Sequence, residues 1–211
     1  QEVLSKKYSG WADPRTWSLQ SLEKRGFKPK SIRNFILNFG LTQTEITAPI
    51  DILYSENKKL IEKTSDRYSF IEEPKKVTIK DSPQKIAKLP LHPDYPKRGN
   101  RKIRTSDKFY VGDKIKRNQT YRFMHLFNFK NHKFISEKHD PELEATLIHW
   151  LPFKGNINVE VIMEDGSKLR GIGEPTLNHV KINQEIQFER RFFARLDKKE
   201  KNKLIFYYTH H

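Results

Sequence analysis

The chain has 211 residues and no cysteine, and its 41 lysines and arginines outnumber 26 aspartates and glutamates, which gives a formal net charge of +15. The absence of cysteine excludes disulfides, thiolate metal ligands and a thiol nucleophile. No apolar run reaches the roughly 20 residues of a membrane-spanning helix, and the first residues carry no secretory signal. We therefore expect a soluble, cytoplasmic protein without a membrane partner.

Aromatic residues and positive charge together indicate a folded protein with a polyanionic partner. Hydrophobic residues make up only 35% of the chain, but 14 Phe, 8 Tyr and 3 Trp supply enough apolar volume for folded units with a charged surface. A net charge of this sign suits nucleic acid, although a lysine-rich thermophilic surface gives the same balance.

Helical periodicity covers the first part of the chain. Asp13 is a plausible N-cap, Pro14 fits the first helical position, and Gly26 can end this helix in a left-handed conformation. A second helix that ends at Gly40 has an apolar stripe at positions i, i+3, i+4 and i+7, formed by Ile32, Phe35, Ile36 and Phe39. A third helix is expected from Pro49 to about Lys63, with Thr47 as its cap and with Leu53, Leu60 and Ile61 facing inward.

Beyond Pro74 the hydrophobic period changes to two, which is typical of strands. Strands are predicted within residues 75–80, 108–115, 121–129, 144–152, 157–173, 185–197 and 202–210. Asp165 and Gly166 lie between two alternating runs and predict a tight hairpin. Residues 83–104 are rich in proline and basic residues and are predicted to form a long ordered loop. So many short strands favour antiparallel barrels.

No catalytic motif is recognisable in the chain. It lacks a phosphate-binding glycine loop, a G-x-S-x-G elbow and an H-E-x-x-H motif. His125, His132 and His139 are spaced by seven residues, but this spacing does not bring three imidazoles together in strands and loops, so we expect no metal site.

Basic residues cluster in two stretches that also contain aromatic residues. The first holds Lys97, Arg98, Arg101, Lys102 and Arg104, and the second holds Lys114, Lys116, Arg117 and Arg122 beside Tyr121 and Phe123. Lysine and arginine neutralise phosphates, and aromatic rings can stack on unpaired bases. A solvated charged face above buried aromatics is the alternative for any single residue, but the clusters and the net charge together favour nucleic acid.

Six stretches, in order, resemble one protein family. They are "GWADPRTWSLQSLEKRGFKPKSIRNFILNFGLTQTEI", "RYSFIEEPKKVTI", "LHPDYPKRGNRKI", "LIHWLP", "GIGEP" and "IQFERRFFARLD". Together they resemble the C-terminal portion of archaeal-type glutamyl-tRNA synthetases and the related glutaminyl enzymes. The chain departs from the family's G-W-D-D-P-R box at Ala12. Residues 4–7, "LSKK", resemble the family's lysine loop but stand too close to this box.

The resemblance implies an α+β fold with two parts. A helical stem-contact segment would occupy residues 1–70, and two antiparallel β-barrels of the anticodon-binding type would occupy residues 71–211. The proximal barrel would comprise about 71–112 and 176–211, and the distal barrel about 113–175. The compact region after Trp150 favours the glutamyl over the glutaminyl type.

The resemblance also implies a function and residue roles. The chain would bind tRNA for glutamate, and possibly for glutamine, within a glutamate–tRNA ligase. Anticodon contacts are expected from Arg67, Arg122, Lys116 and Arg117, and stem or phosphate contacts from Arg15, Lys24, Arg25, Arg33, Arg98 and Arg101. ATP and Mg²⁺ would be bound by a catalytic nucleotide-binding domain or companion chain upstream, so no cofactor is expected in these residues. A free-standing protein that binds structured RNA or assembles synthetases is the alternative.

Overall fold

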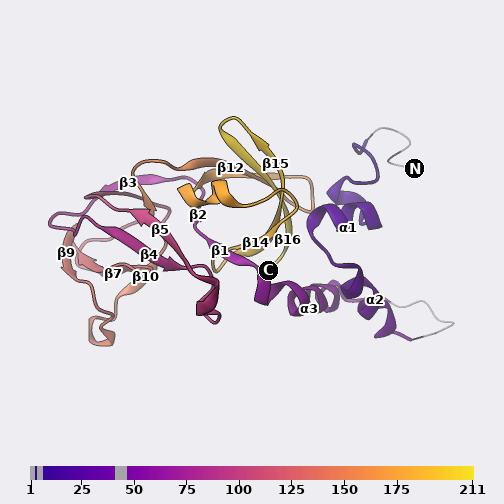
Figure 1. Cartoon of the computed structure of the whole chain (residues 1–211), viewed down its shortest axis with the longest axis horizontal. Coiled ribbons are helices and arrows are strands. Elements are labelled where there is room, and N and C mark those ends of the chain that lie inside the picture. The colour runs from indigo at the N-terminus through magenta and orange to yellow at the C-terminus, as the bar shows by residue number, and fades with distance from the viewer. Residues whose placement is uncertain (1–2, 4–6, 41–46) are drawn as a thin grey trace.

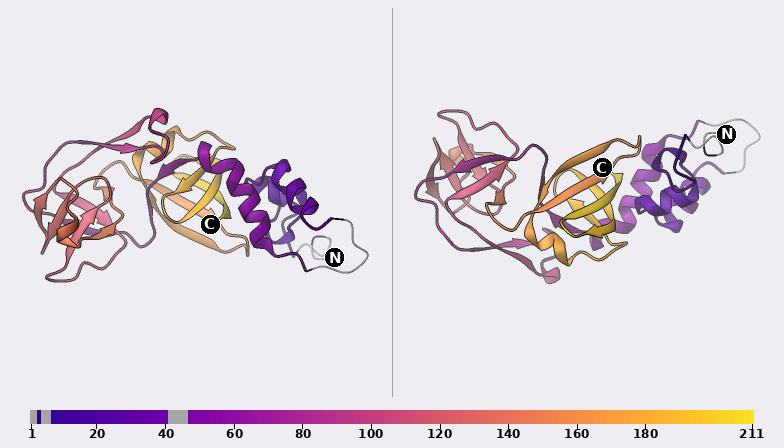
Figure 2. Two further views of the ribbon diagram at one scale, coloured as in Figure 1. Left: turned by 90° about the horizontal axis from the view of Figure 1, so that it is seen from below. Right: turned by 90° about the horizontal axis from the view of Figure 1, so that it is seen from above.

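The computed structural model describes residue 3, residues 7–40 and residues 47–211; residues 4–6 of "LSKK" lie outside this description. The molecule is elongated, with helices at one end and two β-rich units following along the long axis (Figure 1). Two further views show the same order, with the C-terminal strands in the middle unit (Figure 2). The chain thus leaves the helices, enters the middle unit briefly, builds the far unit and returns to the middle.

In its described residues the helical unit contains three α-helices and two short 3₁₀ turns. In chain order these are η1 (Pro14–Thr16), α1 (Leu19–Arg25), α2 (Pro29–Leu37), α3 (Ile50–Ile61) and η2 (Glu62–Thr64). Its core is small and is formed by Leu22, Phe27 and Leu53. Gly26 ends α1 with φ +94°, as the sequence predicts, because a residue with a Cβ is strained in this conformation.

The first predicted helix is interrupted. Asp13 does act as an N-cap, but for η1 alone, since Trp17 adopts a left-handed φ of 53° and breaks the helical path. The side chain of Ser18 then caps α1 by accepting a hydrogen bond from the Ser21 N–H. Leu19, the first residue of α1, is 67% exposed.

The other two helices also differ in detail from the prediction. Ile36 on α2 is 61% exposed, so the predicted apolar stripe is only partly buried against the helical core. The N-cap of α3 is Pro49 rather than Thr47, and no side chain caps this end.

The middle unit, which we call the barrel unit, is a seven-stranded sheet that nearly closes. Its strands run in the order β1-β14-β15-β16-β12-β13-β2. The bounds are β1 (Asp66–Tyr68), β2 (Phe70–Ile71), β12 (Ile157–Ile162), β13 (Lys168–Gly173), β14 (Glu185–Phe188), β15 (Phe192–Glu200) and β16 (Lys203–His210). Because β1 and β2, the two edges of the sheet, are separated only by Ser69, the chain itself joins these edges. The short 3₁₀ helix η5 (Pro175–His179) packs Leu177 into the barrel core.

The far unit, which we call the three-sheet unit, packs three small sheets around one aromatic core. Its sheets have the orders β10-β7-β8-β9, β11-β6-β3 and β4-β5. The bounds are β3 (Lys75–Thr78), β4 (Ile86–Pro90), β5 (Asn100–Arg104), β6 (Lys108–Val111), β7 (Thr120–Phe123), β8 (Asn128–Lys130), β9 (Lys133–Ser136), β10 (Thr146–Ile148) and β11 (Leu151–Pro152), with 3₁₀ turns η3 (Pro96–Arg98) and η4 (Pro141–Leu143). Phe109, Phe123, Phe127 and Phe129 are fully buried in the shared core.

The α+β class is confirmed, but the strands are divided between the two β units differently from the prediction. β3 to β6 share a core with β7 to β11, whereas β12 and β13 belong to the sheet of β14 to β16. Two of the sheets are also mixed, because β1–β14 and β12–β16 in the seven-stranded sheet and β7–β10 in the four-stranded sheet pair in parallel. Residues 83–104, predicted as a loop, contain the antiparallel hairpin β4–β5, in which Ala87, Leu89 and Ile103 alternate into the core.

A buried arginine joins the helical unit to the last strand of the barrel unit. Arg25 is fully buried, and its guanidinium donates to the carbonyl oxygens of Tyr208 and Thr209 at 3.1 and 3.0 Å. It also pairs with Glu164 at 3.0 Å and lies over the Trp17 ring. The helices are therefore fixed to the barrel by charge-assisted hydrogen bonds as well as by apolar contact.

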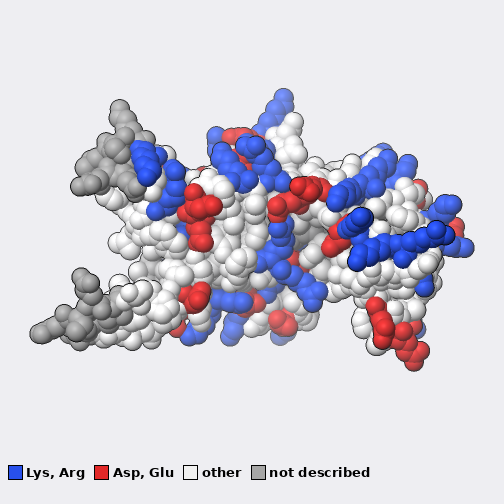
Figure 3. Space-filling view, turned by 180° about the vertical axis from the view of Figure 1, so that it is seen from behind, with Lys and Arg blue, Asp and Glu red and all other residues white. Residues whose placement is uncertain are grey.

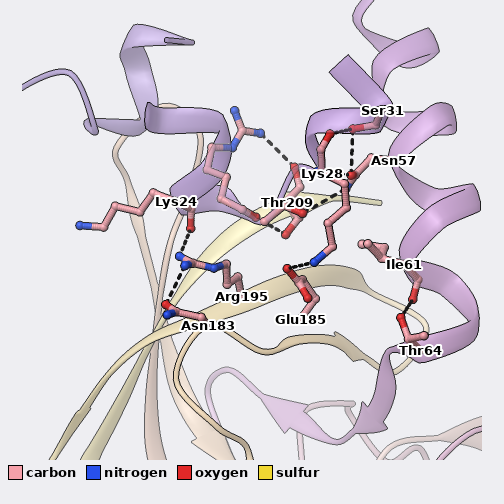
Figure 4. Close-up of polar contacts among 12 residues, drawn as sticks. Lys24, Lys28, Ser31, Asn57, Ile61, Thr64, Asn183, Glu185, Arg195 and Thr209 are labelled. Carbon is pink, nitrogen blue, oxygen red and sulfur yellow. Dashed lines mark hydrogen bonds and ion pairs between the residues drawn. The ribbon is translucent and has the colours of Figure 1, made fainter. Parts of the chain in front are cut away.

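Polar contacts from α1, α2 and α3 surround this joint (Figure 4). Lys28 donates from its Nζ to Glu185 at 2.7 Å and from its backbone N–H to Asn57 Oδ1 at 2.8 Å. Arg195 on β15 donates to the Lys24 carbonyl oxygen at 3.1 Å and to Asn183.

His210 completes the joint from the end of β16. The ring is fully buried against Phe27, Tyr54 and Phe193, and Asn57 Nδ2 lies 3.1 Å from its Nε2. A neutral ring with its proton on Nδ1 satisfies both this amide and the carbonyl oxygen of His211. Burial lowers the pKa of His210 to about 4.

We predict that His210 makes the fold sensitive to mild acid. A folded pKa of about 4, against an ordinary value of 6.5, means that the unfolded chain binds the proton more tightly. Stability is therefore fully present above pH 6.5 and falls as the pH drops toward 4. The loss is about 3 kcal/mol at most, taken from the difference in pKa. Urea unfolding of His210→Gln should show a flatter pH profile in this window. His132→Asn, at an exposed position, should retain the slope, and equal slopes in both variants would contradict the assignment.

Candidate nucleic-acid interface

The predicted phosphate-binding arginines Arg25 and Arg101 are both buried. Arg25 forms the joint described above, and Arg101 on β5 is 2% exposed and pairs with Glu174 of the barrel unit. Neither guanidinium is presented to solvent, so the prediction that they contact phosphate does not fit this structure. Sequence pattern could not reveal this, because a buried arginine and a surface arginine look alike in a basic stretch.

Arg101 instead joins the two β units through a fully buried carboxylate. It donates from Nη1 to Glu174 at 2.6 Å, and Glu174 also accepts from the Ser69 N–H at 2.8 Å and from the Thr176 hydroxyl. Burial raises the pKa of Glu174 overall, although the charge of Arg101 and the hydrogen bonds from Thr176 and the Ser69 N–H act to lower it. Glu174 is the acid of the "GIGEP" stretch, so this motif fixes β13 and η5 against the β4–β5 hairpin.

Glu189 extends the network to the β7–β8 turn. It lies 3.4 Å from Arg101 Nη2 and 3.4 Å from His125 Nε2. Burial acts to raise the pKa of Glu189, but the hydrogen bond from His125 and the charge of Arg101 lower it overall. Two carboxylates of the barrel unit are thus held by Arg101 and His125 of the three-sheet unit, which fixes the relative placement of the units.

A cleft of about 490 Å³ opens above this buried network. We call it the inter-unit cleft. Its lining is Asp66, Tyr68, Leu91, Asn100, Arg101, Lys102, Thr176, His179, Lys181 and Gln184. The side chains come from β1, the β4–β5 hairpin, η5 and the segment before β14, and they combine cations, amides and one buried aromatic ring. Lys102 belongs to a basic cluster seen in the sequence, whereas Asn100, His179, Lys181 and Gln184 carry no sequence signal and are brought together only by the fold.

Arg67 and Arg98 lie at the edge of the inter-unit cleft, beside Asp66. Arg67 is 5% exposed and is held by Glu62 and His92 rather than by the acids Glu72 or Glu73 that follow it in the chain. Its Nη1 has no hydrogen-bond partner within the described residues. Arg98 is half-buried and donates to Asp66 at 2.7 and 2.8 Å.

Arg122 lies in a second, smaller hollow on the three-sheet unit. This hollow of about 270 Å³ is lined by Arg122, Met124, His125, His139 and Leu147. Arg122 Nη1 donates to Asn128 Oδ1 at 3.0 Å and to the Glu137 carbonyl oxygen at 3.1 Å, and burial lowers the pKa of the guanidinium. A positioned arginine beside apolar side chains can both stack on and hydrogen-bond an unpaired base.

The other predicted cations are more open to solvent. Lys116 and Arg117 are exposed in the β6–β7 loop, and Arg33 is exposed on α2. Arg15 is bound to Asp13 and lies over the Tyr8 ring, while Lys24 lies over the Tyr207 ring, 3.8 Å from Asp197. Seen from behind, basic side chains spread over both β units with acidic ones between them (Figure 3).

Two features are absent from the described residues. These residues contain no group of three histidine, aspartate or glutamate side chains that could hold a metal ion. No helix in the described part is both long and apolar enough to cross a membrane.

Comparison with known proteins identifies the family of one part of the chain. Residues 65–149 match the family model described as "tRNA synthetases class I (E and Q), anti-codon binding domain". Residues 65–149 belong to this domain family. The glutamate–tRNA ligase of Methanococcus maripaludis strain C6 is 36% identical over 99% of this chain, and those of Methanocaldococcus jannaschii and Pyrococcus abyssi are 36% identical over 96% and 97%.

The chain spans only about 40% of the length of these relatives. The matched residues of the anticodon-binding family begin at Ser65, next to the edge of the inter-unit cleft, and include all of the three-sheet unit except its last strand, β11. The cleft and the hollow beside Arg122 therefore both involve residues of the matched domain.

We predict that Arg101 is required for stability. Arg101→Ala leaves the fully buried Glu174 without its cation and should lower the free energy of unfolding by about 3–5 kcal/mol, because an uncompensated buried charge is costly. Arg104→Ala, an exposed position on the same strand, should change it by less than about 0.5 kcal/mol. Urea unfolding measures both. The double variant Arg101→Met with Glu174→Gln should recover part of the loss, and a loss as large as in Arg101→Ala would contradict the charge explanation.

Proposed function

We propose that this chain is the tRNA-binding, anticodon-recognising part of a glutamate–tRNA ligase, the enzyme that attaches glutamate to tRNA in an ATP-dependent reaction. The observation that carries the proposal is the inter-unit cleft, a polar, cationic cleft next to and partly within the matched anticodon-binding domain. ATP and Mg²⁺ would act in a catalytic domain beyond these residues. Such an enzyme would act in the cytoplasm.

Base recognition is proposed for the cleft and for the hollow beside Arg122. An anticodon loop offers unstacked bases, whose edges can be hydrogen-bonded and whose faces can be stacked. Arg122 is fixed by three carbonyl-type acceptors, which supports a role in presenting its remaining donors to a base. Arg67 adjoins Asp66 and Tyr68 of the cleft and stays in the proposed site for that reason, but its side chain is only 5% exposed and its unpartnered Nη1 is itself buried, so it is less suited than Arg122 to contact a base directly.

Backbone contacts are proposed for the exposed cations. Lys116 and Arg117 extend from a loop of the three-sheet unit, and Arg33 extends from α2. An A-form stem is gripped mainly through its phosphates and 2′-hydroxyl groups, so such contacts add affinity without sequence preference. Arg15, Lys24 and Arg98 are each paired with a carboxylate in this structure. We propose that their remaining donors contact phosphate.

The helical unit is the proposed contact surface for the catalytic domain. More of the exposed large apolar side chains lie on this unit than on either β unit; they are Trp11, Trp17, Leu19, Ile36, Leu37 and Ile50. The helical unit also shows broad areas without charged side chains in the view from behind (Figure 3). Exposed apolar areas of this kind mark protein contacts. About 60% of the length of the relatives lies outside the part that this chain matches, and a catalytic domain in that part would supply the partner, in the same polypeptide or in a companion chain.

We predict different effects for base and phosphate contacts. Arg122→Ala should weaken binding to tRNA for glutamate and reduce the preference over a tRNA with an altered anticodon by about 1–3 kcal/mol. Arg33→Ala should weaken both tRNAs alike and lower the salt dependence by about one phosphate contact. Filter-binding titrations of both variants against both tRNAs at two salt concentrations measure these effects. An unchanged anticodon preference in Arg122→Ala would overturn its assignment.

We also predict that this chain alone does not activate glutamate. It has no glycine loop to cradle phosphates, and its described residues offer no metal-binding group. ATP–pyrophosphate exchange with glutamate should therefore stay at background, while a full-length relative assayed alongside is active. Clear exchange by this chain would contradict the non-catalytic role.

A further inference from the structure

A polar hollow on the barrel unit lies outside the cleft and the hollow described above. It has a volume of about 340 Å³ and is lined by Gly155, Asn156, Ile157, Asn158, Asn178, Glu200, Lys201, Asn202, Lys203 and Leu204. We call it the asparagine hollow, because four of these side chains are asparagine amides. No role in the function proposed above uses it.

The fold assembles this hollow from three separate segments. β12 and β16 run in parallel and both begin here, with Asn158 and Lys203 in register. The β15–β16 turn supplies Lys201 and Asn202. η5 supplies Asn178, and the Lys199 Nζ donates to the Asn178 carbonyl oxygen at 2.6 Å, which ties the hairpin to η5.

The charges around the asparagine hollow favour an anionic ligand. Residues 198–203 carry four lysines and one carboxylate, that of Glu200, which pairs with Lys198 and Lys203, while Lys203 also lies 4.0 Å from Glu160 of β12. The hydrogen bond from Lys198 and the nearby Lys203 lower the pKa of Glu200, so it is ionised and already neutralised by its neighbours. Lys201 is exposed and has no ion-pair partner among the described residues.

The amides favour a ligand with both donors and acceptors. An asparagine side chain presents one of each and can pair with the edge of a nucleobase. Asn158, Asn178 and Asn202 are exposed, and Asn156 has a buried Oδ1 atom without a hydrogen-bond partner among the described residues. Phosphate-binding lysines next to base-reading amides match the chemistry of a nucleotide.

The asparagine hollow adjoins the inter-unit cleft across η5. In a 3₁₀ helix side chains three residues apart lie on one face. Thr176 and His179 accordingly line the inter-unit cleft, whereas Asn178 lines the asparagine hollow, and the buried Leu177 fixes η5 between them. An RNA strand held in the cleft therefore needs only to pass over η5 to place a neighbouring nucleotide in the hollow.

We propose that the asparagine hollow is a binding site for an unpaired nucleotide of the tRNA that flanks the anticodon triplet. Asn158 and Asn202 contact the base edge, and Lys201 contacts its phosphate. The proposal rests on the proposed function, because it requires that the inter-unit cleft holds the anticodon loop.

The absence of native cysteine allows a direct test of position. Asn202→Cys places a unique thiol beside the hollow, and Ser167→Cys places one on the β12–β13 turn at the opposite end of β12. Each variant is labelled with an iron chelate that cleaves nearby RNA by hydroxyl radicals and is bound to a transcript of tRNA for glutamate. The chelate at position 202 should cleave the anticodon loop next to the triplet, and the chelate at position 167 should not. Cleavage elsewhere, or none, from position 202 overturns the proposal.

Equilibrium binding provides a second measurement. The double variant Asn158→Ala with Asn202→Ala removes no charge and should bind the tRNA roughly tenfold more weakly, as expected for two lost hydrogen bonds. Gln20→Ala, which removes an exposed amide from α1, should bind as the unsubstituted chain does. The proposal is overturned if the double variant binds the tRNA as tightly as the unsubstituted chain does. It is also overturned if the double variant loses its affinity for free adenosine monophosphate but keeps its affinity for the tRNA. If the unsubstituted chain itself shows no anticodon preference, the proposed function fails instead.

Discussion

The ion pair between Arg101 and Glu174 is the contact on which the arrangement of the two β units depends. Both side chains are buried, and they come from different units: Arg101 from the β4–β5 hairpin and Glu174 from the end of β13. A buried pair of this kind adds little net stability over an apolar contact, but losing one partner is costly. Its main effect is therefore to fix the relative placement of the two units, because Arg101 contacts Glu174 and Glu189 together only in this placement.

The ion pair between Arg101 and Glu174 also positions the surfaces that are proposed to bind RNA. Glu174 directly precedes η5, whose side chains face the inter-unit cleft on one side and the asparagine hollow on the other. At the opposite end of the barrel unit, buried Arg25 fixes the helices by binding the carbonyl oxygens of β16. Two buried arginines thus hold three units in a row, and an extended ligand such as a tRNA would meet one continuous, prearranged surface.

Local patterns predicted the elements well where a single physical rule applied. The left-handed turn at Gly26, the hairpin at Gly166 and most strands follow from glycine conformation and from alternating burial. The β4–β5 hairpin was missed because prolines and lysines mask an alternation that is visible only in the burial of Leu89 and Ile103. The split of the first helix at Trp17 likewise has no clear signal in the sequence, because a left-handed tryptophan is unusual.

The sequence by itself determined the fold class, the basic character and, through six ordered motifs, the family. It could not determine which arginines are available to RNA, because burial depends on partners distant in the chain: Arg25 is held by Tyr208 and Thr209, and Arg101 by Glu174. The sequence also could not determine to which unit each strand belongs. The strands β1 and β2 form the edges of a sheet whose other strands, β12 to β16, begin only at Ile157. Only the tertiary structure brings such distant segments together, and it alone creates the inter-unit cleft and the asparagine hollow.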